Sequence, residues 1–146
     1  MVSKDFDHTV PFRQVTNAAG NIIAKYPIVV ATLIGPTGQR RNLPLLFDTG
    51  ADVTTLIHTL YPLLGLHSWD EGIAEQSGTA NGMTTVYRYM VDLELFGKVI
   101  RCPVYLSQGL QANPIFMGLL GRDTIFNEFG FGFWERTQDL YVTANP

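Results

Sequence analysis

The stretch LLFDTGAD, Leu45–Asp52, decides how the chain is interpreted. An apolar run ends there in a carboxylate, Asp48, two residues before Gly50. An ionised carboxylate at the end of a buried strand is costly to remove from water unless another group pairs with it or uses it. One interpretation is an Asx-turn, in which Asp48 accepts a hydrogen bond from the backbone near Gly50. The other is that Asp48 performs chemistry, and the surrounding sequence has to distinguish the two.

The composition is typical of a single turn-rich β domain. The chain has 146 residues, of which 46% are hydrophobic, enough for one proper core. Only 16% are charged, below the roughly 25% of an average soluble protein, whereas there are 14 glycines and 8 prolines. The net charge is -3, and the ten basic residues are scattered apart from Arg40 and Arg41. We therefore expect mainly strands and no nucleic-acid partner.

The sequence favours no metal, cofactor or membrane span. Its single cysteine, Cys102, excludes a disulfide within the chain and is compatible with a reducing compartment. His8, His58 and His67 share no metal-ligand spacing with one another or with Cys102. The N-terminal residues lack an apolar signal-peptide core, and no stretch approaches the roughly 20 apolar residues of a spanning helix. We expect a cytoplasmic protein that needs no cofactor.

Apolar segments bounded by turn residues predict the strands. Ile28–Ile34, the turn Gly35–Gly38 and Leu43–Phe47 predict a hairpin that delivers Asp48 at its far end. Further strands are expected at 54–57, 91–95, 99–106, 129–133 and 140–142. A short helical turn is expected within 58–66, a polar connection over 69–78, and a brief helix-like piece before 129. The aromatic residues of 129–133 are expected to belong to the core.

The first residues differ in character from the rest. Residues 1–25 are polar and are broken by Pro11 and Gly20, which predicts an N-terminal arm or an edge ribbon. The remainder, 26–146, contains neither a repeat nor a linker and is expected to form one domain.

Two later segments give the carboxylate a context. Asp-Thr-Gly alone is a weak motif in a chain of this length. In SGTANGMTT, Ser77–Thr85, the pair Asn81-Gly82 predicts a tight hairpin turn. About seventy residues after Asp48, the chain reads LLGRD over Leu119–Asp123.

Together, LLFDTGADVTTL, SGTANGMTT and GLLGRD resemble, in order and spacing, the retropepsin-like aspartic proteases, the family of the retroviral proteases and their bacterial and cellular relatives. The resemblance covers roughly residues 26 to 134. It implies an all-β fold, a closed or partly open β-barrel with one short helix and one lobe per chain. The hairpin at Asn81-Gly82 takes the place of the family's flap, although its tip is less rich in glycine.

The resemblance also implies roles for individual residues. Asp48 is expected to be the catalytic aspartate, Thr49 to brace the two active-site loops, and Gly50 to meet substrate through its backbone. Asp52 and Arg122 are expected to form a structural ion pair beneath the site, preferably through a bidentate contact. Contacts with substrate are expected from the loop, the flap and the segment before Arg122, at Ala51, Asp52, Ala80, Asn81, Gly82, Met83, Met117 and Leu119.

Elementary chemistry agrees with the roles given to Gly50, to Thr49 and to the pair of Asp52 and Arg122. Gly50 has no Cβ to obstruct a substrate backbone, and Thr49 offers a hydroxyl that satisfies a buried partner without adding charge. Arg122 needs an acid if it is covered, and Asp52 is the natural candidate. Two solvated surface charges are the alternative for that pair. Met83, Met117 and Leu119 can equally be plain core residues.

One carboxylate is half of the catalytic site that the resemblance implies. Hydrolysis by this route needs two carboxylates that share one proton, one acting as base on a water and the other as acid. The sequence has no second Asp-Thr-Gly or Asp-Ser-Gly. A two-fold homodimer supplies the second carboxylate, since its interface brings a residue against its own symmetry mate. We expect an aspartic endopeptidase acting on a peptide or protein substrate.

Two other classes of function remain open from the sequence. The same fold can serve as a non-catalytic dimerisation or peptide-binding module, because a fold does not by itself establish an activity. A small β-barrel that binds a ligand would explain the aromatic residues, but it would leave Asp48 without a role.

Overall fold

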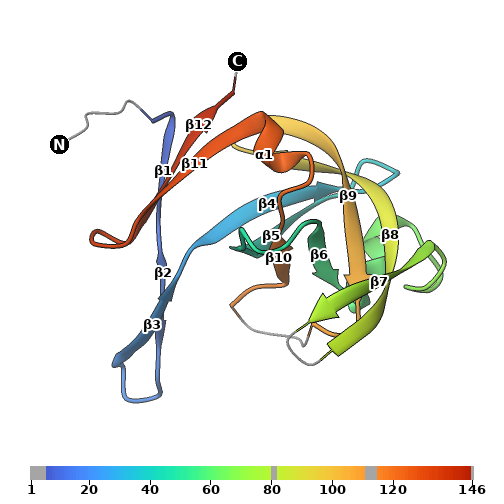
Figure 1. Cartoon of the computed structure of the whole chain (residues 1–146), viewed down its shortest axis with the longest axis horizontal. Helices are drawn as coiled ribbons and strands as arrows, with labels where there is room; N and C mark the ends of the chain where they lie inside the picture. Colours follow the sequence, from blue (N-terminus) through green and yellow to red (C-terminus); the bar gives the residue numbers. More distant parts are fainter. Residues whose placement is uncertain (1–5, 80–81, 111–114, 146) are drawn as a thin grey trace.

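The computed structural model describes residues 6–79, 82–110 and 115–145. Its main sheet has seven strands in the order β4-β5-β10-β6-β9-β8-β7, and β4 also pairs with β8, so that the sheet bends into a nearly closed ring (Figure 1). The strands are β4 Ile28–Ile34, β5 Arg40–Phe47, β6 Thr54–Ile57, β7 Ile73–Thr79, β8 Gly82–Leu95, β9 Lys98–Ser107 and β10 Gly118–Leu120. The expected all-β, single-lobe fold is confirmed.

The ring is filled by the side chains that alternate inward along its strands. Leu43 and Leu45 on β5 and Leu93 and Leu95 on β8 are completely buried. Period-2 alternation of this kind is what a sheet with one face in the core requires. The predicted hairpin is present, with Ile28 paired to Leu46 at the end that leads to Asp48.

Two short helical segments accompany the ring. The expected helical turn after β6 is the 3₁₀ helix η1, His58–Leu64, which ends at Gly65 in the left-handed conformation. The helix-like piece before residue 129 is α1, Ile125–Glu128. No helix in the described part of the chain is long and apolar enough to cross a membrane.

A second, three-stranded sheet joins the two ends of the described chain. Its order is β1-β12-β11, formed by His8–Pro11, Asp139–Ala144 and Phe129–Trp134. The start of the expected N-terminal arm is therefore paired with the C-terminal hairpin. Next along the chain, β2 Arg13–Thr16 and β3 Ile22–Tyr26 form a two-stranded ribbon that projects from the rest of the molecule (Figure 1).

Aromatic residues of β11 support the end of β5. The ring of Phe47, the residue before Asp48, lies 4.6 Å from that of Phe131 and 5.5 Å from that of Phe126, measured between centroids. Phe129 is buried and belongs to the core. Phe129 and Phe131 thus act as core, as expected, and Phe131 supports the segment that carries Asp48. The expectation is wrong for Phe133, which is 42% exposed although its ring still lies 5.0 Å from that of Phe47.

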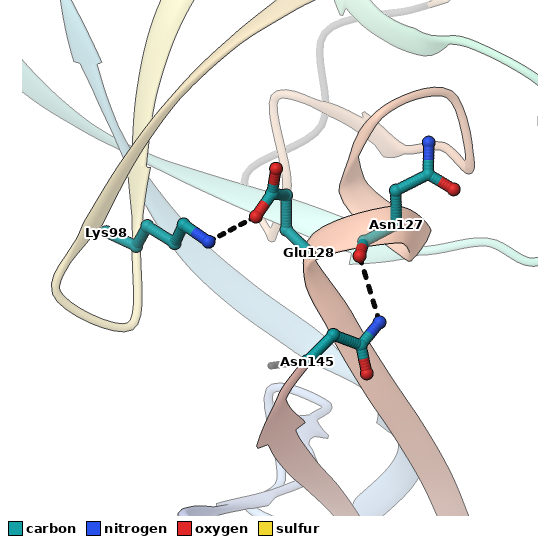
Figure 2. Close-up of polar contacts among 4 residues, drawn as sticks. All are labelled: Lys98, Asn127, Glu128 and Asn145. Carbon is teal, nitrogen blue, oxygen red and sulfur yellow. Dashed lines mark hydrogen bonds and ion pairs between the residues drawn. The ribbon is translucent and has the colours of Figure 1, made fainter.

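Polar contacts hold α1 against its neighbours. Figure 2 shows the ion pair between Lys98, at the start of β9, and Glu128 of α1. Asn145 Nδ2 donates a hydrogen bond of 3.0 Å to the carbonyl of Asn127, and Asn145 N–H donates to the carbonyl of Glu128. Because α1 directly follows the LLGRD segment, these contacts also steady that segment.

The expected polar connection over 69–78 is wrong in part, because β7 occupies Ile73–Thr79. This strand pairs with β8 along its whole length, from Ile73 opposite Arg88 to Thr79 opposite Gly82. It lies at the end of the strand order, and Ile73 is 69% exposed. A strand that buries neither face shows no alternation of apolar and polar residues, which is why the sequence pattern did not reveal it. β8 likewise begins well before residue 91.

Cys102 should be inert towards thiol reagents while the protein is folded. It is completely buried, and burial raises the pKa of its thiol to about 12. At about pH 8, roughly one thiol in ten thousand is then ionised, and the thiolate is the reactive form. We expect the folded protein to be labelled at least about 100-fold more slowly than the protein unfolded with guanidinium, because so little of the folded thiol is ionised. Similar rates in the two states would contradict the burial of Cys102.

Candidate active site

The Asp48 segment is held by backbone hydrogen bonds to a segment about seventy residues later. β5 and β10 are parallel neighbours, with Phe47 opposite Leu120. Where they end, Asp48 N–H donates to the carbonyl of Leu120 (3.1 Å), and Arg122 N–H donates to the carbonyl of Ala51 (3.0 Å). Asp123 N–H donates to the carbonyl of Asp52 (2.7 Å). The two motifs singled out in the sequence therefore form one structural unit.

Thr54 and Gly121 make a fully buried contact within this unit. The backbone N–H of Gly121 donates to the hydroxyl of Thr54 (3.0 Å), and both residues are buried. A Cβ on Gly121 would lie 2.4 Å from the carbonyl carbon of Val53, so no larger residue fits without moving the backbone. Sequence reasoning missed Thr54, because the hydroxyl that could have indicated it is shared with Thr55 in the same short strand.

Asp48 is held by its own turn and keeps one oxygen available. Its Oδ1 accepts a hydrogen bond from Gly50 N–H (2.9 Å), and its backbone carbonyl accepts one from Ala51 N–H (3.2 Å). This is the Asx-turn that the sequence allowed. Its Oδ2 takes no hydrogen bond from the residues that the structure describes. The turn therefore orients the carboxylate without using both of its oxygens.

Asp52 and Arg122 approach each other at the surface of the single chain. Arg122 Nη1 lies 3.9 Å from Asp52 Oδ1, and the two side chains are 58% and 92% exposed, respectively. The contact is a single long one and not bidentate, and an exposed pair of this kind contributes little to stability. The backbone bonds of these residues, and not their charges, hold the two segments together within one chain.

A cleft of about 460 Å³ opens beside Asp48. Its walls come from the Asp48 loop, from the hairpin of β7 and β8, and from the end of β9 with the residues that follow. The lining residues are Asp48, Gly50, Ala51, Asp52, Val53, Thr55, Gln76, Ser77, Gly78, Thr84, Val86, Tyr105, Ser107, Gly109, Leu110 and Leu119.

The cleft gathers some of the predicted residues and omits others. Thr49 is exposed at the tip of the loop and does not line the cleft, and Met117 packs against the core. Gly82 and Met83 begin β8 outside the lining, with Met83 68% exposed. Ala80 and Asn81 lie outside the described residues. The other predicted substrate contacts, Ala51, Asp52 and Leu119, face the cleft with Asp48 and Gly50.

The wall opposite the loop is more polar than the sequence suggested. The hydroxyl of Tyr105 donates to the carboxylate of Glu75, which also lies 3.7 Å from Arg88 Nη1. Burial, followed by the contact with Glu75, raises the pKa of Tyr105 and keeps its hydroxyl protonated. Ser107 Oγ accepts a hydrogen bond from Gly109 N–H (3.0 Å). Tyr105 and Ser107 were missed because they end a strand that otherwise looked like core.

Comparison with known families identifies the family of the chain. A family model described as aspartyl protease matches residues 29–124, a range that contains almost all of the hairpin of β4 and β5, the Asp48 loop, the residues that line the cleft and LLGRD. The chain belongs to the aspartyl protease family. It has the retropepsin-like form of that family, with one lobe per chain. No curated protein matched the chain in a search by sequence.

Potential metal ligands are not clustered in the part of the chain that the structure describes. Within residues 6–79, 82–110 and 115–145, no three His, Cys, Asp or Glu side chains are grouped as a metal site would require. The carboxylates that line the cleft are Asp48 and Asp52.

Replacing Thr54 should loosen the unit that holds Asp48. Thr54→Val removes the acceptor of the buried Gly121 N–H, and an unsatisfied buried donor costs about 1–3 kcal/mol. We expect the melting temperature to fall by roughly 3–12 °C. Thr54→Ser keeps the hydroxyl and should lose about 1 kcal/mol or less. Equal losses for the two variants, measured by thermal unfolding, would show that the hydroxyl is not what matters.

Proposed function

We propose that this member of the aspartyl protease family is an aspartic endopeptidase, in which Asp48 of one chain and Asp48 of a second copy form the catalytic pair. The observation that carries the proposal is the Asp48 loop itself. It is fixed to LLGRD by three backbone bonds, and it presents one carboxylate oxygen beside a cleft. Thr49 and Gly50 are exposed at the same tip, where a second copy could reach them.

A second carboxylate is required by the chemistry. Asp52, the other carboxylate that lines the cleft, is 92% exposed and lies 3.9 Å from Arg122 Nη1. The charged partner of Asp52 is thus an arginine and not a second carboxylate. A two-fold axis at the loop tip would bring Asp48 against its equivalent, where two carboxylates at about 3 Å hold one proton between them.

The reaction then proceeds without a covalent intermediate on the protein. The ionised carboxylate takes a proton from a water molecule, and the water oxygen attacks the peptide carbonyl carbon. The protonated carboxylate donates its proton to the carbonyl oxygen, which gives a neutral tetrahedral diol. The diol then collapses. One hydroxyl gives its proton to the ionised carboxylate, the other carboxyl gives its proton to the amide nitrogen, and the C–N bond breaks to release the amine. The pair again holds one proton at the end.

The cleft suits a peptide in an extended conformation. β7 and β8 form one wall with exposed backbone near Gly78, and an extended peptide can add to such a wall through main-chain hydrogen bonds. Val86, Leu110 and Leu119 offer apolar contacts, while Thr84, Tyr105 and Ser107 offer hydroxyl groups. We propose that the hairpin of β7 and β8 covers the bound peptide and excludes water from the reaction.

Asp48→Asn should abolish cleavage and leave the fold and the dimer intact. The amide keeps the shape of the side chain and an oxygen for Gly50 N–H, but it can neither take nor give the proton. The measurement is cleavage of a denatured protein between about pH 3 and about pH 7, with and without pepstatin, together with the mass in solution. We expect wild-type activity to be highest at mildly acidic pH, where the pair holds one proton.

Asp70→Asn is the matched control, because Asp70 is an exposed acid that does not line the cleft. It should cleave like the wild type. Wild-type cleavage by Asp48→Asn would overturn the mechanism. A wild-type chain that binds peptides, cuts none under any condition and forms dimers would instead be a non-catalytic peptide-binding module.

A further inference from the structure

The ribbon of β2 and β3 is a well-formed element and not a loose arm. Its strands pair from Arg13 opposite Tyr26 towards the tip at Asn17. There, Asn17 Oδ1 accepts hydrogen bonds from the N–H groups of Ala19 and Asn21, both 3.0 Å long. Gly20 has a φ of 83°, a conformation that glycine adopts without strain. The tip is thus organised before any partner arrives.

The ribbon presents two isoleucines that the described chain leaves more than half exposed. Val15 pairs with Ala24 and Thr16 with Ile22, so the register shifts and Ile23 is left without an opposite residue. Ile22 and Ile23 are 53% and 62% exposed. Among the described elements, β2 and β3 make extensive contact only with each other. An isolated two-stranded ribbon is at best marginally stable in water, so a partner surface is expected.

The ribbon is anchored to the C-terminal hairpin and to the segments that lead to Asp48 and to β10. β2 follows Phe12, which is buried and whose N–H donates to the carbonyl of Gln138. β3 leads into Pro27, whose carbonyl accepts the N–H of Phe47, the residue before Asp48. Arg13 Nη1 donates to the carbonyl of Ile115, in the segment that leads to β10 (3.4 Å).

The ribbon and the β7–β8 hairpin extend towards the same edge of the molecule. In Figure 1 the ribbon lies at the lower left and the hairpin of β7 and β8 at the lower right, with β10 between them. β10 is the strand whose last residue, Leu120, accepts the hydrogen bond of Asp48. At about 3.3 Å per residue, the five residues from Ile22 to Tyr26 carry the ribbon roughly 16 Å away from Pro27, so its tip extends beyond the body of its own chain (Figure 1).

The charge of the ribbon is complementary to that of the rest of the chain. Between Arg13 and Tyr26 there are two basic residues, Arg13 and Lys25, and no acid. Without these two, the chain keeps eight of its ten basic residues against thirteen acids, a net charge of -5. The ribbon of one copy is therefore attracted to the body of another.

We propose that the ribbon Arg13–Tyr26 of each chain lies on the second copy and stabilises the dimer that completes the active site. This inference rests on the dimeric site proposed above. The loop from Asp48 to Asp52 is far smaller than the roughly 20–30 residues per side of a stable interface. The ribbon adds two exposed isoleucines and two basic residues, Arg13 and Lys25, to the surface available for the interface. In a two-fold dimer the contact is made twice, once by each ribbon.

The test replaces the exposed isoleucines by glutamate. Ile22→Glu combined with Ile23→Glu places two negative charges where the negatively charged partner would contact, on side chains that the fold of the single chain does not need. Met90→Glu combined with Val99→Glu is the matched control, since Met90 and Val99 are 50% and 54% exposed on β8 and β9. The dimer dissociation constant is measured by sedimentation, and cleavage of a denatured protein is measured over a range of protein concentrations. Circular dichroism checks the fold.

We expect the dimer dissociation constant of the ribbon variant to be at least about tenfold higher than that of the wild type, which is the order of magnitude for losing one important interface contact. Its activity should fall at low protein concentration and recover at high concentration, because the catalytic groups are unchanged. The control should match the wild type. A ribbon variant with the wild-type dissociation constant overturns the inference. If its KM alone rises, the ribbon contacts the substrate and not the second copy. A wild-type chain that stays monomeric and inactive overturns the proposed function itself.

Discussion

The hydrogen bond from Asp48 N–H to the carbonyl of Leu120 is the contact on which the site depends. It exists because β5 and β10 run parallel and end together, and parallel neighbours can be joined only by a crossover of the intervening chain. That crossover contains β6 to β9, which is to say most of the ring. The ring thus positions two loop segments, and the segments fix one carboxylate.

The same arrangement explains why small residues occur where they do. Gly121 lies against the backbone of Val53, and this close approach buries the N–H of Gly121. The hydroxyl of Thr54 accepts the hydrogen bond of that N–H. Phe47 is packed on its other side by the aromatic residues of α1 and β11. Asp48 lies between these contacts, and its side chain is oriented by the hydrogen bond that Oδ1 accepts from Gly50 N–H. The backbone of the loop is fixed by bonds that do not involve the carboxylate.

The sequence was informative where burial and chemistry left a pattern. The hairpin of β4 and β5 alternates and buries one face, so its strands and the position of Asp48 could be predicted from residue type alone. β7 could not be predicted, because an exposed strand at the end of the order carries no such pattern. The role of Thr54 depends on Gly121, 67 positions away, and nothing in the sequence around Thr54 indicates that the two residues meet. The polar wall around Tyr105 was hidden for the same reason, since Glu75 meets it only after β7 and β9 have been placed.

The long crossover between β5 and β10 also determines when the site can exist during synthesis. A chain emerges from the ribosome N-terminus first, at about 5–20 residues per second. Asp48 therefore waits on the order of ten seconds for the segment from Gly118 to Asp123, and without that segment its loop has nothing to bind. A nascent fragment that ends anywhere before β10 carries the Asp-Thr-Gly motif with no fixed geometry. The chain cannot assemble its site until almost all of its own fold has been made.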